Sequence, residues 1–344
     1  MPSIPSILAL VASFAVTVTA NPASHSPFKN KNFVVDAHRG ALGHRTENTL
    51  WAFAYSMELG ADRMEIDVIF TKDEVPIVWH DPSILATKCD GEHVGKLVKD
   101  LTLAQVKSLN CAKQLTNHYG ALLHPVTHIP TLEEFLDLVN CYGNKKAIIN
   151  LELKLSPTAP EQFLPREKYI NNVIPVFEKK GLMDLTIVQS FDWPTVDAIK
   201  KKWPKTTIIC LVGTSQVIPE ADGSFPWLGL NLDSDFNGDW VAAAKFIGCS
   251  GVTPSHGSPG TRTPNSPDYV PFVTKEIVDR AHNLGMTVIP YTVDHAVTVD
   301  KLIDMGVDGV ITNYPEMAMA IAKKRGLKTG HKGSRAHPEC LANA

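Results

Sequence analysis

The regular alternation of short apolar strands with helical segments is the feature that most restricts how this chain can fold. Eight segments combine β-favouring residues with the length of a strand: 33–37, 63–70, 147–153, 185–189, 206–211, 251–253, 286–293 and 309–311. Helical patterns follow nearly all of them, at 47–59, from Thr131 onward, and at 195–202, 240–246, 274–284, 297–305 and 315–324. Because such alternation favours parallel strands, eight units predict an α/β fold, a closed (β/α)8 TIM barrel.

The alternation breaks between residues 82 and 130, where only one short helical pattern, at 102–109, interrupts a run of polar residues. We expect this stretch to be a long insertion after the second strand, and insertions of this length are usually functional. Regular structure resumes at Thr131, because Thr131 and Glu134 have the spacing of a capping box. The barrel is predicted over residues 21–325, with the tail 326–344 outside it.

Residues 7–20 are almost wholly apolar and end in small residues before Asn21. This pattern is typical of a cleaved secretory signal over residues 1–20, although no Lys or Arg precedes the apolar run. We therefore expect a secreted, extracellular protein; the alternative is a buried N-terminal helix. Disulfides would fit that location, and among the six cysteines Cys89 and Cys111 are the expected pair. Closing their loop would contribute roughly 3 kcal/mol in the chain-entropy model.

Charge and hydropathy argue against two kinds of partner. The chain has a formal net charge of −3, whereas nucleic acid as a main partner normally requires a basic face. Beyond residues 7–20 no stretch is long and apolar enough to anchor the protein in a bilayer, so no stable membrane anchor is expected. Transient contact with lipid stays open.

Two carboxylates on the strand 63–70 give the first indication of chemistry. Because strand side chains alternate between faces, Glu65 and Asp67 lie on one face, roughly 7 Å apart along the strand. Carboxylates so close together on an apolar strand resist burial unless a positive charge lies between them. A divalent cation with oxygen ligands is the natural candidate. The alternative is an edge strand with both carboxylates in solvent.

The next strand repeats the spacing, with Glu152 and Lys154 flanked by leucines. In a barrel of this type the carboxyl ends of the strands form the active site, so these side chains would join Glu65 and Asp67 there. Three carboxylates can ligate one hard cation.

Cationic and titratable side chains complete the predicted mouth of the barrel. Arg39 and Lys154 would supply positive charge suited to a phosphate, and His38 and His80 would supply acid–base chemistry near neutral pH. Each feature has a structural alternative, since Lys154 could simply pair with Glu152. Five further histidines are expected to have surface or structural roles: His44, His118, His124, His128 and His256.

An ordered series of motifs extends these features along the chain. The series is His38-Arg39-Gly40, Glu47-Asn48-Thr49, Glu65-Ile66-Asp67-Val68, Thr71-Lys72-Asp73, His80-Asp81, Asp100-Leu101-Thr102-Leu103, Ile129-Pro130-Thr131-Leu132-Glu133-Glu134, Leu151-Glu152-Leu153-Lys154 and Gly306-Val307-Asp308-Gly309-Val310-Ile311-Thr312. It resembles the glycerophosphodiester phosphodiesterase family, within the PLC-like phosphodiesterase TIM-barrel superfamily, over about residues 33–320.

The resemblance implies an enzyme that hydrolyses a small glycerophosphodiester to glycerol 3-phosphate and an alcohol. It implies one divalent cation, Ca²⁺ or Mg²⁺, on the metal-ligand positions, which are Glu65, Asp67 and Glu152 here. It also implies that His38 and His80 act as general base and acid, and that Arg39 and Lys154 bind the phosphate.

The sequence departs from the family pattern at several positions. Thr46 stands where Pro is usual, Tyr291 where Trp is usual, Asp294 where Asn is usual and Asn313 where Asp is frequent. Tyr291 would keep an aromatic wall against the alcohol, and Asp294 would add a charge near it.

Two other functions remain as alternatives. One is a sphingomyelinase D-like phospholipase acting on choline lysolipids or sphingomyelin, which shares the barrel, the histidines and the metal carboxylates. The other is a non-catalytic binding barrel, which the retention of every expected site residue disfavours.

Overall fold

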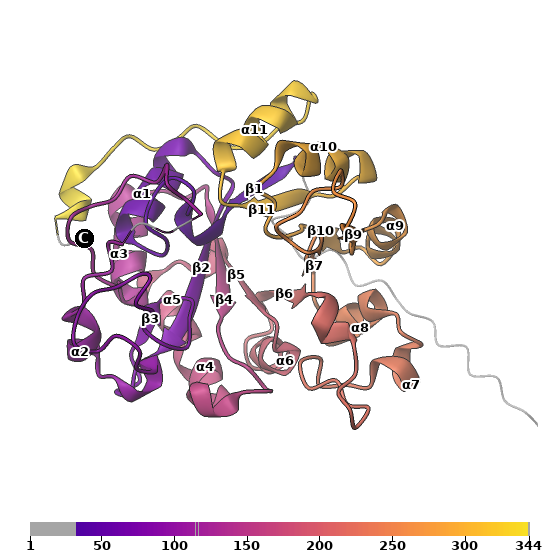
Figure 1. Cartoon of the computed structure of the whole chain (residues 1–344), viewed down its shortest axis with the longest axis horizontal. Coiled ribbons are helices and arrows are strands. Elements are labelled where there is room, and N and C mark those ends of the chain that lie inside the picture. The colour runs from indigo at the N-terminus through magenta and orange to yellow at the C-terminus, as the bar shows by residue number, and fades with distance from the viewer. Residues whose placement is uncertain (1–31, 114, 116, 343–344) are drawn as a thin grey trace, which may run out of the picture. The chain divides into compact units, whose positions relative to one another are not determined.

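A computed structural model describes residues 32–113, 115 and 117–342, and in it eight parallel strands form the predicted barrel (Figure 1). These strands are β1 (Val34–Ala37), β2 (Arg63–Phe70), β4 (Ile148–Leu153), β5 (Thr186–Ser190), β6 (Thr207–Val212), β7 (Gly251–Pro254), β10 (Thr287–Val288) and β11 (Gly309–Thr312). The sheet runs in the order β10-β7-β6-β5-β4-β2-β1-β11. The predicted fold class is confirmed.

Backbone hydrogen bonds join the two ends of this sheet, β10 and β11. The amide of Asp308 donates to the carbonyl of Val288 at 2.9 Å, and the amide of Ile311 donates to that of Pro290 at 2.8 Å. The strand predicted over 286–293 is regular only at Thr287–Val288. One reason is that Pro290 has no N–H to donate to a ladder.

Helices surround the strands on the outside of the barrel (Figure 1). They are α1 (Leu50–Leu59), α3 (Leu132–Tyr142), α4 (Arg166–Asn172), α5 (Ile174–Lys180), α6 (Trp193–Lys202), α7 (Leu232–Phe236), α8 (Trp240–Ile247), α9 (Lys275–Asn283), α10 (Ala296–Met305) and α11 (Pro315–Lys324). The predicted capping box begins α3: the Thr131 hydroxyl accepts from the amide of Glu134, whose carboxylate accepts from the amide of Thr131. Buried leucine, valine, isoleucine and phenylalanine side chains fill the space between helices and strands.

The segment after β2 is an insertion with its own small core. It contains β3 (Pro76–Val78), which pairs antiparallel with β2, and α2 (Leu103–Lys107). Eleven buried side chains form the core, among them Trp79, Ile84 and Leu109. The predicted Cys89–Cys111 disulfide lies within it. A second addition, the two-stranded ribbon of β8 (Gly257–Ser258) and β9 (Val270–Pro271), follows β7.

The tail from residue 326 lies outside the barrel and is attached to it. The amide of His331 donates to the carbonyl of Gly60 at 2.9 Å, and a disulfide joins Cys340 to Cys141 on α3. A third disulfide, Cys210–Cys249, links β6 to the segment before β7.

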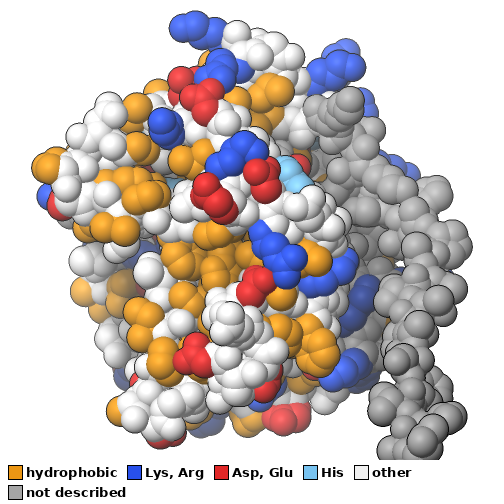
Figure 2. Space-filling model, turned by 90° about the vertical axis from the view of Figure 1, so that its right-hand side faces the viewer, with side chains coloured by type: hydrophobic (Ala, Val, Ile, Leu, Met, Phe, Trp, Pro, Cys, Tyr) orange, Lys and Arg blue, Asp and Glu red, His pale blue; other side chains and the backbone are white. Residues whose placement is uncertain are grey.

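The predicted signal sequence, 1–20, lies outside the described residues. Among the described residues, none of the helices has the length and apolarity needed to span a bilayer. Acidic and basic side chains are interspersed on the described part of the face that Figure 2 shows.

Candidate active site

Three carboxylates converge inside the barrel where β2 and β4 lie side by side. Asp67 and Glu152 are direct partners in the register of the two strands, and Glu65 lies two residues before Asp67 on the same face. One oxygen from each of the three carboxylates lies within 4.8 Å of the others. All three are buried, and Glu65 and Asp67 are 1% exposed. The structure thus brings the predicted ligands together and excludes the solvent-exposed edge strand.

The donor set fits a divalent cation. Among the described residues, Oε1 of Glu65 and Oδ1 of Asp67 are buried without a hydrogen-bond partner, an arrangement that is costly for carboxylates. Burial, followed by the neighbouring charges of Asp67 and Glu152, raises the pKa of Glu65 well above its usual 4.5. Hard cations such as Ca²⁺ and Mg²⁺ prefer oxygen ligands, and one bound here would offset the repulsion among these carboxylates.

Arg39 lies beside this cluster because of an unusual backbone turn. It has φ 51° and ψ 32°, a left-handed conformation that costs a non-glycine residue roughly 1–2 kcal/mol. Here the Arg39 amide donates to Glu65 Oε2 at 2.8 Å, and its guanidinium lies 3.1 Å from Glu47 and 3.2 Å from Asp67. The next residue is a glycine, Gly40, because any side chain there would place its Cβ only 2.7 Å from the Cβ of Ala52.

Lys154 lies on the other strand of the cluster. Its ammonium group is 2.5 Å from Glu152 and 3.7 Å from Asp67. The pairing with Glu152 that the sequence left open therefore occurs, and it holds the Lys154 ammonium group next to the three carboxylates. Burial opposes the charge of Asp67, but His80, Arg39 and Lys154 together hold its pKa below the usual range.

His38 is held in one orientation by a pair of residues from the far end of the chain. Its Nδ1 lies 2.6 Å from Oδ1 of Asn313, whose amide nitrogen donates to Asp294 at 2.6 Å. Because a carboxylate only accepts, the Asn313 oxygen must face His38, and His38 must therefore carry its proton on Nδ1. Burial, with Arg39 as the next cause, lowers the pKa of His38 to about 3. The ring is thus neutral at physiological pH, with Nε2 as its acceptor.

This pair explains two departures from the family pattern. Asp294 and Asn313 are partners of each other, since Asp294 also accepts from the backbone amide of Asn313 at 2.9 Å. Relative to that pattern the carboxylate and the amide have exchanged positions, and in this chain the amide oxygen contacts His38. The sequence identified both positions as departures and did not predict their contact.

His80 has a different partner on the same side of the barrel. Its Nδ1 lies 3.1 Å from Oδ1 of the neighbouring Asp81, which fixes the proton on Nδ1 in the same way. Both histidines line a cavity of about 120 Å³ with Glu65, Glu152, Arg39 and Lys154. The predicted wall residue Tyr291 lines it too, as do Gln189 and Phe191, which the sequence did not single out.

A wider hollow of about 1070 Å³ shares His38 and Tyr291 with this cavity. His44 and His118 line the hollow, and His44 pairs with Glu316 at 2.7 Å.

Of the five histidines for which surface or structural roles were expected, the other three make structural contacts. His124 stacks on Trp51, His128 contacts the carbonyl of Leu109 through Nδ1, and His256 is buried against Tyr269.

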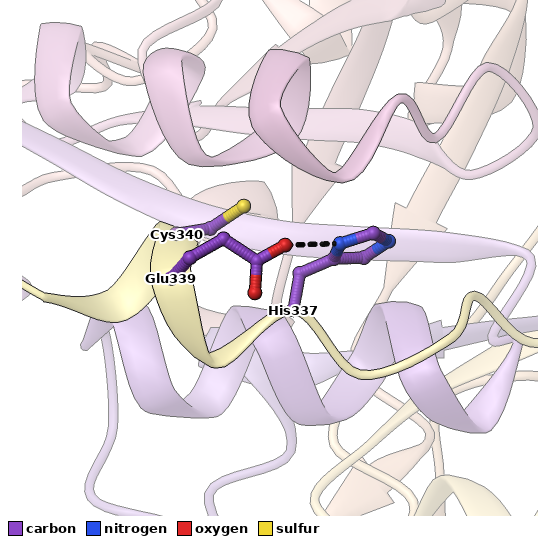
Figure 3. A group of neighbouring side chains, drawn as sticks. All are labelled: His337, Glu339 and Cys340. Atoms are coloured by element: carbon purple, nitrogen blue, oxygen red, sulfur yellow. Dashed lines mark hydrogen bonds and ion pairs between the residues drawn. The ribbon is translucent and has the colours of Figure 1, made fainter.

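A second group of potential ligands, His337, Glu339 and Cys340, lies in the tail (Figure 3). The sulfur of Cys340 is bonded to Cys141, and the carboxylate of Glu339 accepts from His337 at 2.8 Å. This group therefore lacks the thiolate that a metal site there would require.

Comparison with known proteins agrees with a phosphodiesterase barrel. The profile of the glycerophosphoryl diester phosphodiesterase family matches residues 38–317. The glycerophosphodiester phosphodiesterase of Caldanaerobacter subterraneus subsp. tengcongensis is 29% identical over 297 residues, which are 85% of this chain and 99% of that protein. The glycerophosphodiester phosphodiesterase of Bacillus subtilis is 27% identical over 316 residues, 90% of this chain and 94% of that protein.

Solved structures agree as well. A structure from Silicibacter pomeroyi DSS-3, named after the same activity, has a TM-score of 0.71 at 26% identity and covers 87% of this chain and 96% of its own. The phosphodiesterase of Oleispira antarctica, solved with the product sn-glycerol-3-phosphate, has a TM-score of 0.63 at 23% identity over 85% and 97% of the two chains and supports the same fold.

Fold and site together define a phosphoric diester hydrolase built on a TIM barrel. The chain belongs to the glycerophosphoryl diester phosphodiesterase family, and its activity is that of a glycerophosphodiester phosphodiesterase. The family generally uses a divalent metal, in agreement with the cluster of three carboxylates.

Proposed function

We propose that this chain is a secreted, metal-dependent phosphodiesterase that converts glycerophosphodiesters to glycerol 3-phosphate and an alcohol with two histidines as base and acid. The observation that carries the proposal is the pair of buried carboxylate oxygens, Oε1 of Glu65 and Oδ1 of Asp67, that have no hydrogen-bond partner and lie beside two cationic side chains. The Oleispira antarctica relative was solved with sn-glycerol-3-phosphate, which supports this class of product.

Glu65, Asp67 and Glu152 would hold one divalent cation, Ca²⁺ or Mg²⁺. When bound there, such an ion supplies Lewis acidity toward a phosphoryl oxygen. Arg39 and Lys154 lie on either side of Asp67 and would bind the other phosphoryl oxygens. Their charges offset the negative charge that grows on those oxygens in the transition state.

The two histidines have complementary roles. His38 is neutral with a free Nε2, so it accepts the proton of the nucleophile, either water or the neighbouring glycerol hydroxyl. His80 donates a proton to the leaving alkoxide, and Asp81 holds its ring. Attack by the glycerol hydroxyl would pass through a cyclic phosphate.

A turnover panel under metal control tests the proposal. Glycerophosphodiesters, lysophosphatidylcholine and sphingomyelin are offered with Ca²⁺, with Mg²⁺ or with a chelator, and products are followed by phosphorus NMR. We expect turnover of glycerophosphodiesters that the chelator abolishes, and a loss of about 10²–10⁴-fold in His38→Ala and His80→Ala. Unchanged turnover in chelator would contradict the metal requirement, and a preference for lysolipids would favour the sphingomyelinase D-like alternative.

Secretion is supported by the apolar run at 7–20 and by three disulfides, which persist mainly in oxidising compartments. Expression of the full chain in a secreting host, followed by N-terminal sequencing of the protein in the medium, tests it. We expect a mature chain that begins at Asn21.

A further inference from the structure

One lysine of the inserted segment connects the two sides of the candidate active site. The ammonium group of Lys88 lies 2.5 Å from Oε1 of Glu47 and 2.5 Å from Oδ2 of Asp81. The other oxygen of Glu47 contacts Arg39 at 3.1 Å, and the other oxygen of Asp81 contacts His80 at 3.1 Å. Each carboxylate thus contacts Lys88 through one oxygen and a residue that lines the active-site cavity through the other.

Burial makes these contacts stronger than surface ion pairs. The side chains of Lys88, Glu47 and Asp81 are 13%, 4% and 18% exposed. Partly buried pairs are screened less by solvent than exposed ones, and removal of one partner leaves the others with an uncompensated charge.

The backbone around Lys88 is held as firmly as its side chain. The carbonyl of Lys88 accepts from the amide of Lys113 at 3.2 Å, and the next residue, Cys89, is buried in the disulfide with Cys111. The ammonium group also lies 5.3 Å from the centre of the Trp79 ring. Lys88 is therefore fixed at both ends.

Without the ammonium group, the carboxylates of Glu47 and Asp81 would face each other across a low-dielectric gap. Like charges so placed repel, and the least buried side chain of the set, Asp81, would turn outward. His80 would then lose the acceptor that orients its ring. Arg39 would keep Asp67 as a partner but would lose the fixed position of Glu47.

We propose that Lys88 is a positioning residue for phosphodiester hydrolysis, which orients His80 through Asp81. Arg39, which Lys88 reaches through Glu47, keeps its contacts with Asp67 and Glu65 and depends less on this lysine. This proposal rests on the proposed function, in which His80 protonates the leaving group. Lys88 itself touches neither the substrate nor the reacting atoms. Its removal should therefore act on the step that needs the acid, and only weakly on steps that do not.

Leaving-group dependence separates this role from a general loss of structure. A choline leaving group departs as a strongly basic alkoxide and needs protonation, whereas p-nitrophenolate is stable without it. In Lys88→Met we expect kcat for glycerophosphocholine to fall about 10–100-fold, the range typical of residues that orient a ligand or catalytic group. For the p-nitrophenyl ester of glycerol 3-phosphate we expect a fall of less than about threefold. His80→Ala should show the same contrast.

Three further variants complete the experiment. Lys88→Arg keeps a cation between the two carboxylates and should recover most of the lost kcat. Asp81→Ala removes the acceptor of His80 while the contacts of Glu47 with Lys88 and Arg39 remain, and it should reproduce the contrast, which keeps the proposal testable even where Lys88→Met fails to fold. Lys113→Met is the matched control, because it removes a lysine of the same segment that pairs with the exposed Asp90.

The proposal is overturned where Lys88→Met lowers kcat for both substrates equally, or for neither. It is also overturned where Lys113→Met gives the same contrast, or where Asp81→Ala folds and gives none. A wild-type chain that turns over neither substrate in saturating cation would refute the proposed function itself, and the proposal about Lys88 with it.

Discussion

Replacement of Glu65 by glutamine should change the stability of the protein in opposite directions with and without a divalent cation. In metal-free protein, Glu65 is a buried carboxylate with one unpartnered oxygen, next to two other carboxylates. The amide of Gln keeps the shape and can accept from the Arg39 amide as Glu65 does. It removes the charge that burial, Asp67 and Glu152 disfavour. Glu65→Gln should therefore stabilise the metal-free protein and weaken cation binding.

The expected magnitudes follow from the burial of the site. A buried acceptor without a partner costs about 1–3 kcal/mol, so the metal-free variant should gain about that much. In a chain of this size that corresponds to roughly 2–6 °C in Tm. In the wild type, a cation at about 1,000 times its Kd contributes about 4.1 kcal/mol, or roughly 8 °C. The order of the two melting temperatures should therefore invert between chelator and cation.

The measurement is thermal unfolding of the wild type, Glu65→Gln and the control Glu161→Gln, in chelator and in millimolar Ca²⁺ or Mg²⁺. Glu161 is an exposed carboxylate, so its substitution should leave Tm unchanged in both conditions. The pH dependence gives a second test. A raised folded-state pKa contributes stability that is present below 4.5 and lost as pH rises through that pKa. In chelator the advantage of the variant should vanish below about pH 4.5 and grow as pH rises.

The reasoning would be refuted by a Glu65→Gln variant that melts below the wild type in chelator as well as in cation. Such a result would mean that the carboxylate is stabilised by the protein alone. A wild-type Tm that does not respond to either cation would contradict the metal site directly.

Two further predictions concern residues distant from each other in sequence. Asp294→Asn and Asn313→Asp should each lower kcat about tenfold. The first substitution removes the carboxylate that fixes the Asn313 amide against His38, and the second places two carboxylates in contact. The double variant, which exchanges the two residues, should recover most of the activity, and additive losses in it would contradict the pairing. Replacement of both Cys141 and Cys340 by serine opens a loop of 199 residues and should lower stability by up to roughly 5 kcal/mol. Since the tail contacts the barrel away from the active-site cavity, kcat should be unchanged below the new Tm, and a loss of activity there would contradict this separation.

The barrel was predictable because a strand-like apolar run in the sequence marks each of its eight strands, including the run 286–293 around the two-residue β10. β2 and β4 are eight and six residues long, and every residue in them except the partly buried Ile148 is buried. The ribbon of β8 and β9 has two residues per strand, too few to show any alternation. The helices α4 and α5 were not assigned because Pro165 and Pro175 interrupt the helical pattern between residues 155 and 185. Closure between β10 and β11 depends on backbone hydrogen bonds at Pro290, which no side-chain pattern reports.

The same distinction applies to the candidate site. Glu65, Asp67 and Glu152 were predictable because period two places them on the inner face of neighbouring strands. The partner that orients His38 and the lysine that joins Asp81 to Glu47 were not, since they lie on loops whose course is set by tertiary packing. Asn313 lies 275 residues from His38, and Lys88 reaches Glu47 across 41 residues only because the insertion folds back over the barrel.

Charge balance links the cation to the substrate. With both histidines neutral, the five carboxylates and three cationic side chains around the cavity leave an excess of two negative charges. The carboxylates are Glu47, Glu65, Asp67, Asp81 and Glu152, and the cations are Arg39, Lys88 and Lys154. A phosphodiester is itself an anion and would be repelled by this excess.

One divalent cation would cancel the excess. Metal-free, Arg39 and Lys154 are engaged by Asp67 and Glu152, the same groups that would ligate the cation. If a cation bound those carboxylates, the positive charges of Arg39 and Lys154 would no longer be neutralised by them and would be available to a phosphate. Cation binding and phosphate binding would therefore be coupled through shared carboxylates, so each should increase the affinity for the other.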